Sequence, residues 1–412
     1  MTNVGWTRKH HDAASGSIRW RFRSQGVIVG LLFGAVVATG VSWASIPDAS
    51  GSITGCYKAT ASSSYALKVL DTAKAAACPS GYSTLTWTSG QAPALADPQQ
   101  AVQLDWNSPD TFTGSAYGFN SPTGAVFDGT HLWVANTSGN SVTEINPTDG
   151  SPVRILSGGS YGFNHPEYLT FDGTHIWISN TVPTGSSVTE INAKDGSWIR
   201  TLSGGSYGFD NPSQMAYDGS HIWIVNPAAS SVTEINASDG SWVRTLSTGY
   251  ALAGPLAIAF DGSRLWVANY LTNSVTLINA SDGSFNRNLS GIAFQFGGPD
   301  SIAFDGQNMW IADSTGAQRV TEVALTNLIV GKFYLEPGFA QAVAIDGSQL
   351  WVTAGSEVDT YPLSAFYNTW SDGRYRTFTA GLNDPIFLVF DGTHMWAINN
   401  NGNSITKFPD GI

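Results

Sequence analysis

Three acidic residues have the types and places of a candidate cation site. Asp300 and Asp313 lie 13 positions apart in one repeat unit, and Glu167 occupies the same place as Asp300 in another unit. Carboxylate oxygens gathered in a concave site suit hard cations such as Ca²⁺ or Mg²⁺, and they also attract organic cations. Two carboxylates alone rarely hold a metal ion, so two solvated acids on an acidic protein are the competing interpretation.

Four histidines share one turn position in their repeat units: His131, His175, His221 and His394. Packed sheets lie about 10 Å apart, whereas zinc–nitrogen bonds are about 2 Å long. Neighbouring sheets therefore cannot easily share a metal ion through these side chains. We expect ordinary turn residues here.

The chain shows no familiar catalytic motif. It has no Ser-His-Asp order, glycine-rich phosphate loop, CxxC pair or HExxH sequence, so no catalytic residue is predicted. Its two cysteines, Cys56 and Cys78, both follow an apolar segment. A structural disulfide between them is expected if this part of the chain is exported.

A repeat must position any such site. The signature Asp-Gly-x-x-apolar-Trp occurs seven times, and successive tryptophans are 41 to 46 positions apart. Its first and last residues are Asp128 and Trp133, Asp172 and Trp177, Asp218 and Trp223, Asp261 and Trp266, Asp305 and Trp310, Asp346 and Trp351, and Asp391 and Trp396. A period of 40–50 residues rich in β-formers and turns indicates propeller blades. We predict an all-β, seven-bladed β-propeller.

Each unit contains four predicted strands. In the first unit these are 125–127, 131–135, 141–145 and 153–156, separated by turn residues such as Asp128-Gly129. The last unit stops after its third strand, near residue 410. Residues 108–122 align with a fourth strand and its exit loop, so residues 110–113 should complete the last blade and close the ring.

The repeats resemble the YVTN and NHL families of propeller repeats. Residues 263–278 (SRLWVANYLTNSVTLI) match the YVTN pattern closely, and the resemblance covers residues 107–412. The virginiamycin B lyases, whose repeats also read Asp-Gly-x-x-Trp, are a distantly similar family. This resemblance implies a propeller fold, but propellers host many unrelated activities.

Two positions in each unit should line the mouth of the central channel. The entry positions, five residues before each signature Asp, are Thr123, Glu167, Ser213, Leu256, Asp300, Gln341 and Ile386. The exit positions, eight residues after it, are Asn136, Asn180, Asn226, Asn269, Asp313, Ala354 and Asn399. The lyase resemblance implies a general-base His at an entry position and a metal-binding Glu at an exit position. Neither is present. The asparagines are equally explained as caps of the following turn.

Tryptophans are expected in two environments. The seven signature tryptophans recur in every unit and should form the core between blades. Trp198 and Trp242 follow Asp-Gly turns before the outermost strand, with Phe285 at the same place in the next unit. These side chains are expected at the surface, where they could contact a protein or a glycan.

The N-terminal segment points to export. Residues 1–45 carry a net charge of +4, and 27–44 are 18 residues without a charge, whereas the whole chain has a net charge of −12. A cleaved secretory signal and a membrane anchor are both compatible with this pattern. Either places the remainder outside the cytoplasmic membrane, at the cell surface or secreted. A body this acidic repels phosphate backbones, so nucleic acid is not an expected partner.

The predicted organisation is therefore an export segment (1–45), a small Cys-bracketed β module (46–90), a linker (91–106) and a propeller (107–412). We predict a monomeric binding scaffold without catalytic machinery, whose partner is a protein, a wall polymer or a small ligand. The alternative is a metal-dependent lyase or lactonase with its site at the channel mouth. No cofactor is certain, and Ca²⁺ or Mg²⁺ are the candidates.

Overall fold

The structure is a computed structural model of the chain. It describes residues 109–409 except 183–184, 316–318, 329, 335–338 and 364–375, and for 332–334 it describes the backbone alone. Further towards the N-terminus it describes only the backbone of three strands. The chain divides into two compact units, residues 1–102 and 103–412.

The N-terminal unit contains one small antiparallel sheet. Its strands are β1 (Ser52–Lys58), β2 (Ala66–Leu70) and β3 (Ser83–Thr88), in the order β2-β1-β3. Cys78 and the side chain of Cys56 lie outside the described residues, as does the apolar segment 27–44. The disulfide and the export segment therefore stay predictions. Within the described part of the chain, no helix has the length and apolar character needed to cross a membrane.

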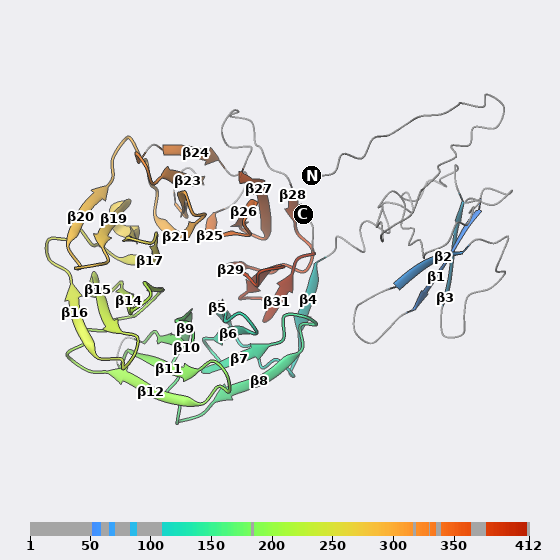
Figure 1. Ribbon diagram of the computed structural model, residues 1–412, viewed down its shortest axis with the longest axis horizontal. Coiled ribbons are helices and arrows are strands. Elements are labelled where there is room, and N and C mark those ends of the chain that lie inside the picture. The colour runs from blue at the N-terminus through green and yellow to red at the C-terminus, as the bar shows by residue number, and fades with distance from the viewer. Residues whose placement is uncertain are drawn as a thin grey trace, which may run out of the picture. The chain divides into compact units, whose positions relative to one another are not determined.

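The second unit is a seven-bladed propeller of four-stranded antiparallel sheets around a central axis (Figure 1). Blade 1 is β5 (Pro122–Phe127), β6 (Leu132–Asn136), β7 (Ser141–Ile145) and β8 (Pro152–Ser157). Blade 2 is β9 (Pro166–Phe171), β10 (His175–Asn180), β11 (Ser187–Asn192) and β12 (Trp198–Ser203). Blade 3 is β13 (Met215–Tyr217), β14 (His221–Asn226), β15 (Ser231–Asn236) and β16 (Trp242–Leu246).

Blade 4 is β17 (Pro255–Phe260), β18 (Arg264–Asn269), β19 (Ser274–Asn279) and β20 (Phe285–Leu289), with a short 3₁₀ helix η1 (Tyr270–Thr272) after β18. Blade 5 is β21 (Pro299–Phe304), β22 (Asn308–Asp313), β23 (Arg319–Ala324) and β24 (Val330–Tyr334). Blade 6 is β25 (Ala340–Ile345), β26 (Gln349–Ala354), β27 (Glu357–Pro362) and β28 (Arg376–Phe378). Blade 7 is β29 (Pro385–Phe390), β30 (Met395–Asn399), β31 (Ser404–Lys407) and β4 (Asp110–Thr113). The predicted seven-bladed fold is confirmed.

The signature aspartate and tryptophan form one hydrogen-bonded turn in every blade. In blade 1 the Asp128 Oδ1 accepts the backbone N–H of Thr130 and of His131, both at 2.7 Å. Its Oδ2 accepts the indole N–H of Trp133 at 2.7 Å. The same indole–carboxylate bond occurs in the other six blades at 2.7–2.8 Å. The glycine after the aspartate has a positive φ, 91° at Gly129, which explains why glycine follows the aspartate each time.

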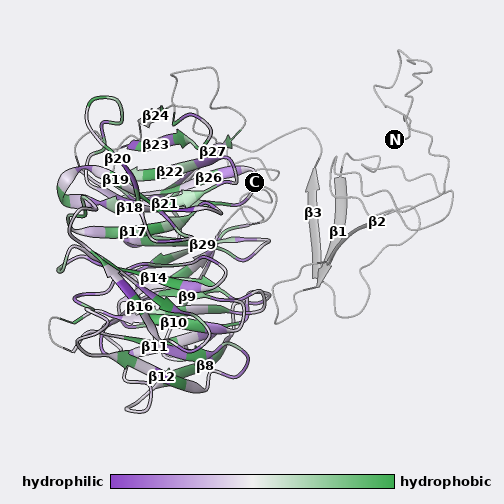
Figure 2. Cartoon of the chain, turned by 60° about the vertical axis from the view of Figure 1, so that its left-hand side comes forward, coloured by the Kyte–Doolittle hydropathy of each residue, from purple (hydrophilic) through white to green (hydrophobic). Residues whose placement is uncertain are grey.

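The core lies between adjacent blades, as predicted. All seven signature tryptophans are at most 2% exposed. Trp177 of blade 2, for example, packs in one cluster with Ile222 and Ile224 of blade 3. Figure 2 shows the matching hydrophobic bands along the strands of the propeller. Trp198, Trp242 and Phe285 are instead exposed, again as predicted.

Two distant segments of the chain close the ring. β4 pairs antiparallel with β31, placing Thr113 opposite Ser404 and Asp110 opposite Lys407. This is the closure predicted from the repeat alignment. Pairing both ends of the repeat region in one blade leaves no interrupted blade whose edge could attract another chain.

Candidate functional site

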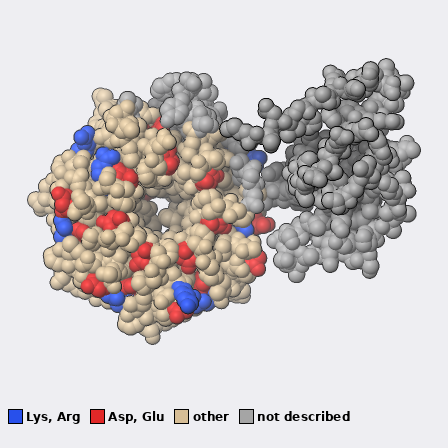
Figure 3. Space-filling view, in the orientation of Figure 1, with Lys and Arg blue, Asp and Glu red and all other residues tan. Residues whose placement is uncertain are grey.

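A small cavity at the centre of the ring collects most of the entry positions. It has a volume of about 110 Å³ and is lined by Thr123, Glu167, Tyr168, Gln214, Asp300, Ser301, Gln341, Ile386 and Phe387. Five of these nine are predicted entry positions; Ser213 and Leu256 are not among the lining residues. Figure 3 shows the opening in the centre of the propeller face, with acidic side chains around it.

The innermost strands turn the entry residues into this cavity by a local irregularity. Glu167 and Asp300 each follow a proline that begins its strand, Pro166 and Pro299. In blade 5 the pairing runs from Pro299–Asp313 directly to Ser301–Ala312, so Asp300 is the extra residue of a β-bulge. Bulges re-aim a side chain without ending the strand, and they are common beside functional sites.

Burial shapes the acidity of the two cavity carboxylates. It is the main cause that raises the pKa of Asp300 to about 6, a hydrogen bond from Ser314 opposes the shift, and the nearby charge of Glu167 adds to it. Burial also raises the pKa of Glu167, opposed by a hydrogen bond from Thr181 and by His165. The two acids come from blades 2 and 5, and the charge of Glu167 acts on Asp300. A cation between them would relieve this repulsion.

A third polar side chain, that of Gln341, lines the cavity. The side-chain Oε1 of Gln341, from blade 6, is buried and has no hydrogen-bond partner among the described residues. Buried polar atoms of native proteins are nearly always paired with protein, water or ligand. The cavity therefore presents acceptors from three blades and would suit a group that donates hydrogen bonds and carries positive charge.

The exit asparagines have a different place, inside the blades. Asn136, Asn180, Asn226 and Asn269 are fully buried, and none lines the cavity. Each donates from Nδ2 to a threonine hydroxyl of the third strand at 2.9–3.0 Å. The Oδ1 of Asn180 also accepts the backbone N–H of Asn164 in the loop before the innermost strand. These side chains cross-link strands and loops, a structural role that differs in its partners from the turn cap expected from the sequence.

Asp313 occupies the asparagine position of blade 5 and is fully buried too. Its carboxylate accepts the N–H of Gly297 at 2.9 Å and the hydroxyl of Thr321 at 3.2 Å, and it lies 3.4 Å from Arg319 Nε. Burial raises its pKa to about 6, although these three partners oppose the shift. The structure therefore does not bring Asp313 to the cavity with Asp300. Over the described residues, no three potential ligands gather to hold a metal ion.

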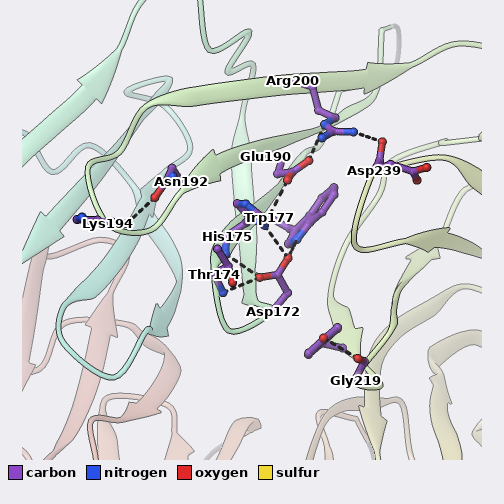
Figure 4. Close-up of polar contacts among 11 residues, drawn as sticks. Asp172, Thr174, His175, Trp177, Glu190, Asn192, Lys194, Arg200, Gly219 and Asp239 are labelled. Carbon is purple, nitrogen blue, oxygen red and sulfur yellow. Dashed lines mark hydrogen bonds and ion pairs between the residues drawn. The ribbon is translucent and has the colours of Figure 1, made fainter.

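The histidines belong to a network with buried carboxylates and arginines that was not predicted from the sequence. In blade 2, His175 Nδ1 lies 3.1 Å from Asp172 and 3.4 Å from Glu190, while Arg200 Nε lies 2.8 Å from the other Glu190 oxygen (Figure 4). Arg200 also donates to the backbone oxygen of Asp239 in blade 3. The histidines are thus more than turn residues, because they contact buried carboxylates. The recurring sequences SVTE and (I/V)R, which lie in three successive units, were the available signal.

Known proteins resemble this chain in their fold and not detectably in their sequence. No family model matches it, and no curated protein matches its sequence. Among solved structures, the hydrazine synthase of Kuenenia stuttgartiensis is similar with a TM-score of 0.59 and 18% identity over 73% of this chain and 98% of that one. A streptogramin B lyase has a TM-score of 0.58 and 16% identity over 74% and 97%.

Virginiamycin B lyase from Staphylococcus aureus, in selenomethionine form, gives a TM-score of 0.58 and 17% identity over 74% of this chain and 99% of that one. The predicted distant similarity to the virginiamycin B lyase propeller is therefore confirmed at the level of the fold. At these identities the likeness carries no chemistry.

Proposed function

We propose that this propeller is a binding protein whose central cavity takes the cationic head group of a small organic ligand, such as a primary amine. The observation that carries the proposal is the convergence of Glu167, Asp300 and the unpaired Gln341 oxygen on one cavity from three blades. An ammonium group donates hydrogen bonds in three directions and brings the charge that two neighbouring carboxylates require.

The size and lining of the cavity favour a head group over a whole ligand. A volume of about 110 Å³ is below that of ordinary small-molecule sites, which enclose about 300–1,000 Å³. Tyr168 and Phe387 line the cavity with their rings 6.1 Å apart, and aromatic faces attract alkylammonium groups. The rest of the ligand would extend towards solvent along the channel.

A divalent metal ion and a lyase reaction fit the residues less well. Ca²⁺ takes six to eight oxygen ligands, whereas this cavity offers two carboxylates. No entry position carries the histidine, and no exit position the glutamate, that the lyase resemblance implies. A metal-dependent lyase or lactonase stays the alternative function, and Mg²⁺ and Ca²⁺ are therefore included among the probes of the binding experiment.

Calorimetric titration of the full chain tests the proposal, with propylamine, Mg²⁺ and Ca²⁺ as probes. We expect heat from propylamine, and at least tenfold weaker binding in Asp300→Asn and in Glu167→Gln. The matched control is Asp313→Asn, whose carboxylate lies in the same blade outside the cavity, and it should bind like the wild type. Equal affinity in all three variants, or heat from the metal ions alone, would reject an amine site.

The pH dependence of binding follows from the raised pKa values. A cation favours the ionised carboxylates, so binding lowers their pKa values and releases protons. Affinity should therefore rise between about pH 5 and pH 7, as Asp300, with a pKa of about 6, ionises, and should level off above that range. Affinity that is constant from pH 5 to pH 8 would contradict a role for Asp300.

We also propose that the propeller functions outside the cytoplasmic membrane, because basic residues precede the uncharged segment 27–44. Protease added to intact cells should then cleave the propeller loops. Cleavage that requires cell lysis would place the protein inside.

A further inference from the structure

One row of side chains recurs across blades 1 to 3 with the same chemistry. A signature tryptophan on the second strand pairs in register with a glutamate on the third and an arginine on the fourth. The three rows are Trp133-Glu144-Arg154, Trp177-Glu190-Arg200 and Trp223-Glu234-Arg244. The arginine Nε lies 2.5–2.8 Å from the glutamate, and each glutamate is at most 2% exposed. The arginine covers and neutralises the carboxylate.

Blade 5 keeps this row but lacks its arginine. Trp310 pairs with Glu322, and Glu322 pairs with Gly331. Asn308 occupies the position that is histidine in blades 1 to 3. Its side-chain Nδ2 donates a hydrogen bond to Asp305 Oδ2 at 3.2 Å. In the described part of the propeller, no hydrogen bond or ion pair reaches the Glu322 carboxylate.

The glycine has no side chain at the position where blades 1 to 3 have the arginine. A Cβ at Gly331 would lie 2.5 Å from Glu322 Oε2, so the carboxylate lies over the backbone where the arginine side chain would begin. Glu322 is partly exposed, in contrast to the buried glutamates of blades 1 to 3. A group from solvent can therefore reach the carboxylate.

We infer that Glu322 and Gly331 form a binding site for a guanidinium group that takes the place of the missing arginine. Guanidinium is favoured because its planar fork matches a carboxylate and because blades 1 to 3 show that this row accommodates it. Burial and the nearby charge of Asp305 raise the pKa of Glu322 to about 7, as expected for a carboxylate that has no counter-charge. This inference is independent of the central cavity, which other strands form.

Binding of blocked amino acids to the full chain at pH 8 tests the site. In the Asp300→Asn background, in which the proposed amine cavity is weakened, acetyl-arginine-amide should bind at least tenfold more tightly than acetyl-lysine-amide, and acetyl-citrulline-amide, which is neutral, should not bind. Glu322→Gln should abolish arginine binding, whereas Asp300→Asn should leave it unchanged. Tighter binding of acetyl-arginine-amide than of methylguanidinium assigns the site to a protein side chain, and the reverse order assigns it to a small guanidinium compound.

A variant that supplies the missing arginine separates the site from non-specific charge attraction. Gly331→Arg should rebuild the row of blades 1 to 3, block acetyl-arginine-amide and raise the melting temperature by about 2–4 °C. Gly331→Gln fills the space without charge and should not stabilise, and the gain should vanish when Glu322→Gln is combined with Gly331→Arg.

Two outcomes would overturn the inference. The first is equal binding of the arginine and citrulline probes, or binding that survives Glu322→Gln. The second is a gain in melting temperature from Gly331→Gln equal to that from Gly331→Arg, because filling the space would then suffice without a charge.

Discussion

Blades 1 to 3 and blade 5 share their backbone pattern and the Asp–Trp hydrogen bond, yet the surroundings of the third-strand glutamate differ between them. In blades 1 to 3 the third-strand glutamate has an arginine and a histidine beside it. In blade 5, Glu322 faces Gly331 and Asn308 instead. The turn is needed by every blade, whereas the row of charges can change without loss of the fold.

Other blades show further solutions in the same row. Blade 4 pairs Leu277 with Arg287, which removes the carboxylate. Blade 7 exchanges the charges, because Lys407 stands on the third strand and Asp110 on the fourth. Lys407 Nζ donates to the backbone oxygen of Pro147 in blade 1 at 2.8 Å, as Arg200 donates to Asp239 in blade 3. A cation that donates to the backbone of the next blade is thus common to blades 1, 2, 3 and 7.

Removing an arginine from blade 2 should have the largest effect. Arg200→Ala leaves Glu190 buried without its main counter-charge, and burial already raises the pKa of Glu190. We expect a loss of about 3 kcal/mol in the free energy of unfolding, measured by denaturant titration at pH 8. Arg287→Ala is the control, because Leu277 opposes it, and it should cost less than about 0.5 kcal/mol. Similar losses in both variants would show that arginine packing, not the ion pair, matters.

Breaking the shared turn should cost the same in both kinds of blade. Trp177→Phe and Trp310→Phe each remove an indole N–H from a signature aspartate, with bonds of 2.8 and 2.7 Å. The lost hydrogen bond and a small cavity should together cost about 2 kcal/mol in each variant. Thermal unfolding of the two variants side by side checks this. A much larger loss in blade 2 would mean that its charge network also depends on the tryptophan.

Neutralising Glu322 should have the smallest effect and the opposite sign. The pKa of Glu322 is about 7 in the folded protein and exceeds the ordinary value of 4.5, so the protonated carboxyl group contributes to the stability of the fold. This contribution to stability is lost as the pH rises through 7. Partial exposure screens the charge, so Glu322→Gln should stabilise by about 1 kcal/mol at pH 8 and hardly at pH 5. Denaturant titrations at both pH values measure the difference. Destabilisation at pH 8 would reveal a cation already bound there.

The repeat made most of the fold predictable. Asp, Gly and Trp recur at fixed spacing because one turn uses all three, through the carboxylate of Asp128, the positive φ of Gly129 and the indole of Trp133. The strands and the closing segment Asp110–Thr113 followed from the same alignment. The exit positions were harder to interpret, because a strand end gives no sign of whether its side chain turns to the channel or into the blade. Asn136 and Asp313 turn inward, to donors and acceptors of the third strand and the preceding loop.

The sequence by itself determined the number of blades, the ring closure and the buried tryptophans, because each depends on local turn chemistry and on a pattern repeated seven times. Only the tertiary structure decided which acids meet. Glu167 and Asp300 lie in blades 2 and 5, and the closed ring brings them to one cavity. Asp300 and Asp313 are close in the chain, but a β-bulge turns Asp300 to the channel, whereas Asp313 is buried beside Arg319. The absence of an arginine opposite Glu322 likewise depends on strand pairing, because the residue that faces a strand position is set by register across the sheet.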